Sequence, residues 1–152
     1  MGERAKKARE LFEQGYNCAQ SVAGAFADEM GLPFETVVRL SSTFGGGMGR
    51  LREVCGAVSG MMLVAGMKYG YTGPKDFASK KRTYAMVQAL AEEFRAANGS
   101  IVCRELLGLS GKSNPSPAPR TGEYYKKRPC AELVEYAAHI LEKYEPDENK
   151  EK

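Results

Sequence analysis

Hydrophobic side chains recur through most of the chain at the three- and four-residue intervals of an amphipathic helix. The first such segment covers residues 4–14, with apolar positions 5, 8, 11 and 12 on one side and Gly15 at its end. The same spacing predicts further helices at residues 18–30, 33–43, about 51–70, 75–98 and 103–107, and a last one that starts at Pro129. In the long helix over residues 75–98, we expect Tyr84, Val87, Ala91 and Phe94 to face inward.

Runs of alternating β-branched and aromatic residues, which would indicate strands, are absent from the sequence. We therefore predict an all-α protein. The chain has 152 residues, of which 43% are hydrophobic, and this length suits one domain because two would each bury too small a core. The predicted architecture is a single-domain bundle of five or six helices over residues 1–145, followed by a polar tail at residues 146–152 that frays.

The charge balance and the apolar segments exclude two classes of partner. Lys and Arg outnumber Asp and Glu by 22 to 19, and the net charge of +3 is too small to indicate a nucleic-acid-binding protein. The most apolar stretch, residues 54–67, is shorter than the roughly 18 apolar residues of a membrane helix, and it contains three glycines and a serine. The charged N-terminus is not followed by an apolar segment, so no secretory signal is predicted, and we expect a cytoplasmic protein.

Glycines gather before and within the apolar helix. Residues 44–50 contain four of them and are predicted to form a non-helical loop. Glycine lowers helix propensity, and the usual return is the close approach of another backbone or of a bound group. We expect a cofactor or a neighbouring helix to approach closely at five of these glycines: Gly45, Gly46, Gly47, Gly56 and Gly60. We expect tight packing at Gly66 as well. The loop lacks the Lys-Ser/Thr ending of a P-loop and follows no strand, so phosphate binding is not predicted.

The candidate chemistry lies in the cysteines, each of which falls at or near the start of a predicted helix. In a reducing compartment such residues are more often catalytic, metal-binding or inert than permanent disulfides. The unpaired N–H groups at a helix start favour a thiolate and lower a cysteine pKa from its free value of about 8.5. The four residues are Cys18, Cys55, Cys103 and Cys130.

The spacing of the cysteines leaves several kinds of site open. No C-x-x-C occurs, which excludes thioredoxin, zinc-ribbon and closely spaced ferredoxin motifs, so any joint site has to be assembled by the fold. Four converging thiolates could bind iron, zinc or an iron–sulfur cluster. Two adjacent thiolates could instead form a reversible disulfide with each other. Their co-reactant would be a redox partner protein, a small thiol or another electron carrier. The remaining alternative is a helical interaction module with inert thiols.

The order of the cysteines, the box over residues 55–60 (Cys-Gly-Ala-Val-Ser-Gly) and the glycine loop before it resemble the redox-active protein family C_GCAxxG_C_C. The resemblance covers most of the chain and implies that all four cysteines are signature residues, with Gly56, Ala57 and Gly60 completing the box. It implies redox chemistry, and through cytochrome-linked relatives it also supports an iron–sulfur centre. The chain has no C-x-x-C-H haem attachment motif.

Among the candidate residues, we expect Cys55 to be the most reactive thiol, because glycines on both sides should leave it accessible. Arg104, Lys127 and Arg128 are close in sequence to Cys103 or Cys130 and could stabilise thiolates. His139, the only histidine, lies off the apolar stripe of the last helix, so we expect it in solvent and predict no Cys–His catalytic pair. The apolar glycine-bearing helix and aromatics such as Tyr124 and Tyr125 are compatible with a homodimer.

Overall fold

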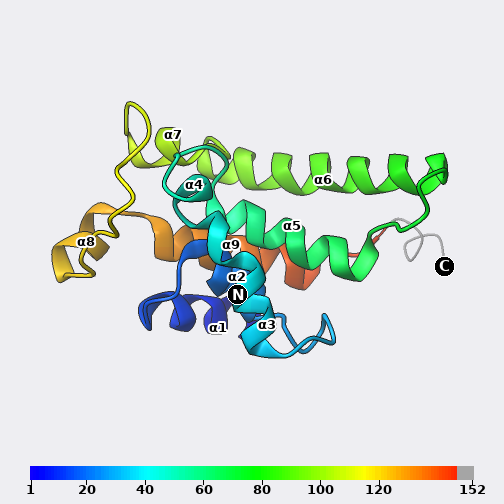
Figure 1. Ribbon diagram of the computed structural model, residues 1–152, viewed down its shortest axis with the longest axis horizontal. Coiled ribbons are helices and arrows are strands. Elements are labelled where there is room, and N and C mark those ends of the chain that lie inside the picture. Colours follow the sequence, from blue (N-terminus) through cyan, green and yellow to red (C-terminus); the bar gives the residue numbers. More distant parts are fainter. Residues whose placement is uncertain (147–152) are drawn as a thin grey trace.

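The computed structural model describes residues 1–146, apart from the side chains of residues 126 and 127. Within these residues every regular element is helical, which confirms the all-α prediction (Figure 1). The elements are α1 (Glu3–Glu13), α2 (Cys18–Gly24), α3 (Phe34–Ser41), the 3₁₀ turn η1 (Ser42–Phe44), α4 (Gly45–Met48), α5 (Gly56–Tyr69), α6 (Phe77–Asn98), α7 (Cys103–Leu107), α8 (Gly122–Lys127) and α9 (Cys130–Lys143).

Helix α9 occupies the centre of the packing and contacts α1, α2, α5 and α6. Its apolar side, from Leu133 to Leu141, is buried, as the periodicity predicts. Helix α1 likewise buries its four expected residues against α9 and α2. The largest fully buried side chains include Phe12, Phe26 and Phe94, which belong to three different segments and join them in one core.

Helices α2 and α5 approach each other at two small residues. A Cβ at position 60 would lie 2.7 Å from the carbonyl oxygen of Ala19, and one at position 56 would lie 3.0 Å from Cβ of Cys18. Gly56 and Gly60 therefore give the expected clearance to a neighbouring backbone. The expectation of tight packing is wrong for Gly66, where an added Cβ would meet nothing within 4 Å.

The described residues contain nine α-helices, more than the five or six predicted. Helix α8 was not predicted because its short, basic sequence has no apolar periodicity; its start is fixed by Thr121, whose hydroxyl accepts a hydrogen bond from the Tyr124 amide at 3.2 Å. Helix α4 is a single turn inside the predicted glycine loop, and Gly46 and Gly47 within it have left-handed rather than α-helical torsions.

Three other sequence predictions need correction. Helix α2 ends at Gly24 instead of residue 30, because the chain continues in tighter turns such as the one closed by Phe26 N–H to Ala23 O. Helix α5 starts at Gly56, several residues later than predicted. The buried side of α6 is formed by Met86, Leu90 and Phe94. Tyr84 is exposed, and its hydroxyl lies 3.4 Å from that of Tyr71.

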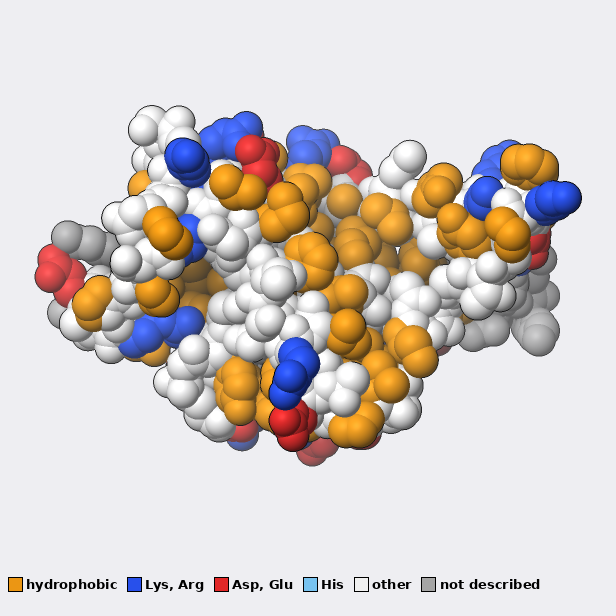
Figure 2. Space-filling model, viewed as in Figure 1, with side chains coloured by type: hydrophobic (Ala, Val, Ile, Leu, Met, Phe, Trp, Pro, Cys, Tyr) orange, Lys and Arg blue, Asp and Glu red, His pale blue; other side chains and the backbone are white. Residues whose placement is uncertain are grey.

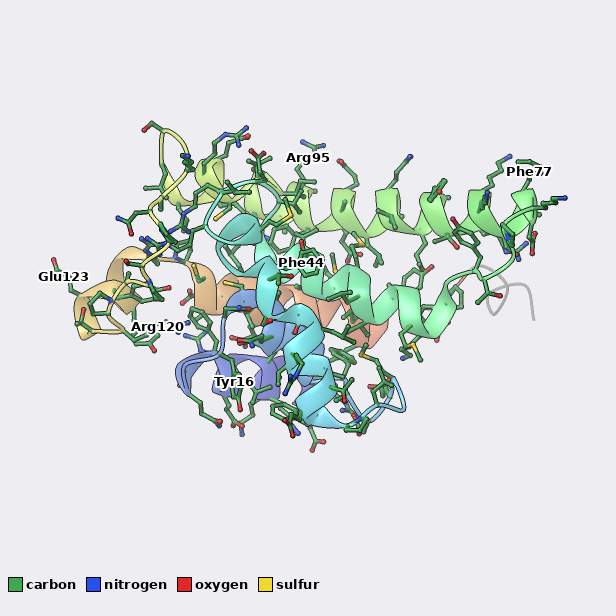
Figure 3. All side chains as sticks on the ribbon, viewed as in Figure 1. Tyr16, Phe44, Phe77, Arg95, Arg120 and Glu123 are labelled. Carbon is green, nitrogen blue, oxygen red and sulfur yellow. The ribbon has the colours of Figure 1, made fainter. Side chains whose placement is uncertain are left out.

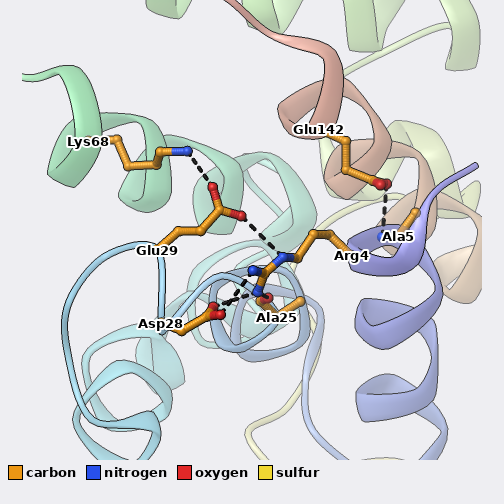
Figure 4. A network of polar contacts seen from close by, with 7 residues as sticks. All are labelled: Arg4, Ala5, Ala25, Asp28, Glu29, Lys68 and Glu142. Atoms are coloured by element: carbon orange, nitrogen blue, oxygen red, sulfur yellow. Dashed lines mark hydrogen bonds and ion pairs between the residues drawn. The ribbon is translucent and has the colours of Figure 1, made fainter.

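A polar network fixes α1 to the rest of the molecule (Figure 4). The Arg4 guanidinium donates to the Ala25 carbonyl at 2.8 Å and to the Asp28 carboxylate at 2.9 Å. It also pairs with Glu29 at 3.1 Å, and Lys68 of α5 pairs with the same carboxylate at 2.6 Å. Hydrogen bonding to Arg4 lowers the pKa of Asp28 to about 2. The turn after α2 is thereby tied to both α1 and α5.

Among the described residues, no helix is both long enough and apolar enough to cross a membrane. Residues 147–152, most of the tail that we expect to fray, lie outside the part of the chain that the structure describes.

Candidate functional site

The first cysteine is positioned by a complete capping box at the start of α2. The Asn17 side chain accepts a hydrogen bond from the Gln20 amide at 2.9 Å, and the Gln20 side chain accepts one from the Asn17 amide at 3.1 Å. Asn17 also donates to the Ser42 carbonyl at 3.0 Å, which ties this helix start to η1. Cys18 is thus the first helical residue, as predicted.

The glycine loop forms a left-handed turn that reverses the chain ahead of Cys55. Gly46, Gly47, Met48, Gly49 and Arg50 all have φ between 58° and 71°. Such torsions are costly for residues with a Cβ, which is why glycine predominates here. The turn is closed by the Arg52 amide on the Gly46 carbonyl at 3.1 Å and by the Glu53 amide on the Gly47 carbonyl at 2.9 Å.

After this turn, residues 53–55 run antiparallel to residues 101–103. The Cys55 amide donates to the Ile101 carbonyl at 2.7 Å, and the Cys103 amide donates to the Glu53 carbonyl at 2.6 Å. Val54 and Val102 form the isolated bridge between the two segments. Because side chains alternate along paired segments, Cys55 and Cys103 project to the same side, at diagonal positions. This short pairing brings together two cysteines that are far apart in the sequence.

Cys130 is the first residue of α9 and follows Pro129, which caps the helix. Helix α9 packs against α2, and Cys130 and Cys18, the first residues of these helices, line the same cavity. Side-chain hydrogen bonding between Cys18 and Cys130 is the first cause of the opposite pKa shifts of these two thiols. Among the described cysteines, these are the two whose pKa shifts have each other as the first cause.

All four cysteines line one cavity of about 410 Å³. Helices α2, α5, α7 and α9 contribute their N-terminal ends to it, and α8 and the segment before α8 close one side. A hollow on the left of the face drawn in Figure 2 shows hydrophobic side chains in its depth and basic side chains beside it. A cavity of this size suits a small molecule.

The cavity wall is strongly cationic. Among the described lining residues there is no Asp or Glu, whereas four arginines contribute: Arg50, Arg52, Arg120 and Arg128. Arg120 donates to the carbonyls of Phe12 and Tyr16 at 2.9 and 3.0 Å, and so lies between α8 and the end of α1 (Figure 3). Arg120 and Arg128 both lie against the ring of Tyr124.

The thiols respond differently to this setting. The pKa of Cys130 is lowered, first by the hydrogen bond from Cys18 and then by Arg128, Arg120 and Arg52. The pKa of Cys18 is raised well above its usual range, because its proton is held in that bond and because burial disfavours its charge. Burial raises the pKa of Cys55 to about 12, against the opposing effect of the Ala57 and Val58 amides. Of these two thiols, Cys130 is therefore the one that ionises more readily.

A comparison with protein families finds a match over residues 16–144, to the family described as "Putative redox-active protein (C_GCAxxG_C_C)". The chain belongs to this family. Comparison with curated proteins and with solved structures found no match. The family match includes all four cysteines and the C-G-A-x-x-G box, and it confirms the resemblance on which the sequence analysis drew.

In this C_GCAxxG_C_C protein, the box has a divided role. Cys55 and Gly56 line the cavity, together with Gly45 and Gly46 of the loop. Gly60 instead packs against Ala19 of α2, away from the cavity wall. Gly47 is also a packing residue, since an added Cβ would lie 2.6 Å from the Glu53 amide nitrogen and 2.7 Å from Cys103 Cβ. Of the five glycines singled out in the sequence, Gly45, Gly46 and Gly56 thus lie on the cavity wall, and Gly47 and Gly60 give clearance to neighbouring segments.

Two expectations about thiol reactivity are corrected. Cys55 is only 4% exposed, so the flanking glycines do not leave it more accessible than Cys103 or Cys130; Gly56 is occupied by packing against Cys18 and backbone atoms. The helix starts also do not lower every thiol pKa, because burial outweighs the local amides at Cys55. Among the thiols with a shifted pKa, Cys130, at 7% exposure, is the one shifted toward easier ionisation.

Of the three charged residues that the sequence places near Cys103 and Cys130, one belongs to the site. Arg128 lines the cavity, as expected. Arg104 instead pairs with Glu53 at 3.1 Å and with the Arg52 carbonyl at 3.3 Å. The side chain of Lys127 lies outside the described residues. His139 is half-buried against the Tyr136 ring rather than in solvent, and it does not line the cavity.

Sequence reasoning missed Arg50, Arg52 and Arg120 as site residues. The first two do carry a signal, since they are two cations within five residues of Cys55 in a segment rich in glycine and apolar residues. Arg120 stands at the end of a proline-rich stretch and carries no comparable signal. Only the fold places it against the thiols.

The sulfurs share a cavity without forming a ready ligand set. Within the described residues, no three His, Cys, Asp or Glu side chains are grouped closely enough to hold a metal ion. All four cysteines are present as free thiols.

Proposed function

We propose that the protein carries out thiol–disulfide exchange through Cys18 and Cys130. The observation that carries this proposal is the position of both thiols at the starts of the packed helices α2 and α9, on one cavity large enough for a small molecule. Two thiols at the starts of helices that pack against each other are placed where a disulfide can join them. Their opposed pKa shifts also assign different roles to them, since the thiolate is the attacking species.

The exchange begins at Cys130. Its thiolate attacks one sulfur of a disulfide R–S–S–R, forms a mixed disulfide and releases RS⁻. Cys18 then loses its proton to this outgoing thiolate and attacks the Cys130 sulfur, which forms the Cys18–Cys130 disulfide and releases the second RS⁻. One disulfide is reduced to two thiols while two protein thiols are oxidised, so electrons and protons balance. The reverse sequence reduces the protein with two small thiols.

The site favours a small co-reactant. Cys130 is 7% exposed, and the cavity of about 410 Å³ is the route by which a reagent reaches it. A protein disulfide presented on a rigid surface fits such a recess poorly, whereas the disulfide of a low-molecular-weight thiol fits within it. Cys55 and Cys103 are expected to stay reduced during this exchange.

The experiment uses the full chain, reduced and purified anaerobically, with an excess of 2-hydroxyethyl disulfide. We expect two of the four thiols to be lost, and peptide mapping by mass spectrometry to find one disulfide, between Cys18 and Cys130. In Cys18→Ser the reaction should stop at the mixed disulfide on Cys130, because the resolving thiol is gone. Cys55→Ser is the matched control and should still form the bond. A different disulfide, or none, contradicts the proposal.

A second candidate, a four-cysteine metal or iron–sulfur centre, is favoured by the lining of one cavity by all four cysteines. The arrangement described above does not fit such a group directly, since no three of these sulfurs form a ligand set. Loading would require the Cys55 and Cys103 side chains to turn toward Cys18 and Cys130. Iron and zinc analysis of anaerobically purified protein, with its visible absorption spectrum, tests this candidate: stoichiometric metal supports it and replaces the exchange reaction.

A further inference from the structure

The cavity carries more positive charge than its own residues balance. Arg50, Arg52, Arg120 and Arg128 line it, and none of them forms an ion pair with a carboxylate of a described residue. The thiolate of Cys130 can offset only part of this charge. The pKa of Arg50 is lowered by burial and by the neighbouring Arg52 and Arg128, as expected where cations crowd together.

Arg52 is the one buried side chain among the four arginines. It is 2% exposed, its Nε donates to the Ser113 hydroxyl at 3.0 Å, and its Nη1 donates to the Cys103 sulfur at 3.6 Å. Its Nη2 is buried and has no hydrogen-bond partner. A buried cation without a counter-charge is expensive to keep, and an unpaired buried N–H adds to that cost. Because Arg52 lines the cavity, a bound molecule with a hydrogen-bond acceptor could satisfy this N–H group.

We infer that the cavity binds a small molecule through an oxyanion group, with Arg52 as the central contact and Arg50, Arg120 and Arg128 as the surrounding positive wall. This inference rests on the proposed exchange reaction, for which it names the co-reactant class: a small thiol or disulfide that carries a carboxylate or phosphate. The planar guanidinium matches both groups, because two of its N–H bonds can point at two oxygens at once.

The rest of the wall suits the carbon skeleton of such a molecule. Leu106, Leu107 and Leu133 line the same cavity and provide apolar surface. A short aliphatic chain can lie there, while its anionic end reaches Arg52 and its sulfur reaches Cys130. The arrangement also orients the reaction, because an anionic end held by the arginines fixes which end of the molecule faces the thiols.

The first test measures binding at equilibrium and needs no redox reaction. Isothermal titration of the reduced full chain with glutarate and with inorganic phosphate separates the two oxyanion classes. We expect saturable binding of at least one of them. Arg52→Gln should weaken it by about tenfold or more, since hydrogen bonds to charged groups contribute strongly. Arg39→Gln removes the same charge from the exposed surface of α3 and should leave binding unchanged.

Because Arg52→Gln could disturb the turn before Cys55, Arg128→Gln provides a second variant. Arg128 makes a ring contact with Tyr124 and is not part of that turn. The Arg128→Gln substitution should weaken binding of the same anion by several-fold, while the far-ultraviolet circular dichroism spectrum stays native. If neither glutarate nor phosphate binds the wild-type protein, or if both variants bind as the wild type does, the inference is overturned.

The second test measures reaction rates with three disulfides of similar size: 3,3′-dithiodipropionate, which is anionic, 2-hydroxyethyl disulfide, which is neutral, and cystamine, which is cationic. For the wild-type protein we expect the anionic reagent to react fastest and the cationic one slowest. In Arg52→Gln and Arg128→Gln the ratio between the anionic and neutral rates should fall, whereas in Arg39→Gln it should not. Equal rates for all three reagents contradict the inference.

The two tests keep this inference separate from the proposed function. If glutarate or phosphate binds through Arg52 but no disulfide oxidises Cys18 and Cys130, the exchange reaction is wrong and the anion site stands. If all three disulfides oxidise the pair without charge preference and neither anion binds, the exchange reaction stands and the anion site is wrong. Stoichiometric iron in the cavity would overturn both the exchange reaction and the anion site, because an iron–sulfur cluster would use the cysteines as ligands and its negative charge would balance the arginines.

Discussion

The thiols of Cys18 and Cys130 illustrate how one hydrogen bond can divide the roles of two like residues. Both begin a helix and both line the same cavity, yet the proton lies on Cys18 and the negative charge is favoured on Cys130. Arg128, Arg120 and Arg52 break the symmetry, because they act on the Cys130 sulfur. The different pKa values of the two thiols therefore depend on which sulfur accepts the hydrogen bond. The helix start does not distinguish them, because each of the two residues begins a helix.

The donor role of Cys18 can be tested by two substitutions of similar size. In Cys18→Ala the hydrogen bond is lost, so the pKa of Cys130 should rise toward its usual range. In Cys18→Ser a hydroxyl can still donate, so the pKa of Cys130 should stay low. The measurement is the rate of Cys130 alkylation by iodoacetamide as a function of pH, followed by mass spectrometry of its peptide. Identical pH profiles in the two variants would show that Cys18 does not set the pKa of Cys130.

Cys55 should make the stability of the protein sensitive to alkaline pH. Because burial raises its pKa to about 12, the fold favours the protonated thiol. This stabilisation is complete below the unfolded pKa of about 8.5, and it is lost as the pH rises toward the folded value, at roughly 1.4 kcal/mol per pH unit. Urea unfolding at pH 8 and pH 10 should show a larger loss for the wild-type protein than for Cys55→Ala. Parallel losses would mean that the thiol ionises freely in the folded state.

At the scale of elements, two close contacts hold the cysteine-bearing segments in place. One is the approach of α5 to α2 at Gly60, and the other is the left-handed turn over residues 46–50. The first keeps Cys18 and Cys55 on the same cavity, and the second directs residues 53–55 into their pairing with residues 101–103. Both depend on positions where a side chain would not fit.

Substitution of Gly60 and Gly66 should have opposite effects on stability. A Cβ at position 60 would lie 2.7 Å and 3.1 Å from backbone atoms of Ala19, so α2 and α5 would have to separate, at a cost of about 1–3 kcal/mol. At Gly66 an added Cβ meets nothing within 4 Å. Gly66→Ala should therefore stabilise α5 by about 0.5–1 kcal/mol through helix propensity. The free energies of urea unfolding measure both changes, and equal values would show that α2 and α5 are not in close approach.

The glycine turn allows a similar comparison between Gly47 and Gly49. Both have positive φ, so alanine is strained at either position by about 1–2 kcal/mol. Only at position 47 would the added Cβ also collide, with the Glu53 amide and Cys103. Gly47→Ala should thus lose more stability than Gly49→Ala and should also change the rate at which Cys103 is alkylated. Loss of equal size at both positions, with Cys103 unaffected, would contradict the packing role of Gly47.

The sequence predicted the helix starts of Cys18, Cys103 and Cys130 because their signals are local: Asn17 before the first, and Pro129 before the last. The start of α5 could not be placed in this way. Its preceding residues are held by the glycine turn and by pairing with residues 101–103, and that pairing is not visible in any local pattern. The arginine wall was missed for the same reason, since Arg120 reaches the cavity from a segment more than 60 residues away from Arg52.

For the whole molecule, the fold packs the beginning of the described chain against its end. Helix α1 and the turn after α2 are connected by Arg4, and α9 contributes Glu142, which accepts a hydrogen bond from the Ala5 amide at 3.0 Å (Figure 4). The beginning and the end of the described chain thus form a single packed unit with Cys18 and Cys130 at one end of it. A bond between those two sulfurs would link segments that are already held together.

This arrangement predicts that oxidation stabilises the protein. A Cys18–Cys130 disulfide closes a loop of more than 100 residues, and a cross-link of that length constrains the unfolded chain by about 4–5 kcal/mol. Urea unfolding of the oxidised protein should show a higher midpoint and a smaller dependence on urea than that of the reduced protein. Cys18→Ser treated with the same oxidant is the control and should show no such rise.

Unfolding and reduction of the disulfide are linked equilibria. The free energy by which the disulfide stabilises the folded state therefore equals the free energy by which folding stabilises the disulfide against reduction. The native pair should therefore be harder to reduce than the same pair in urea, and equilibration with thiol–disulfide buffers in both conditions measures the difference. Oxidation that lowers the midpoint of unfolding would contradict this, since it would mean that the native fold holds the two sulfurs in a geometry that resists the bond.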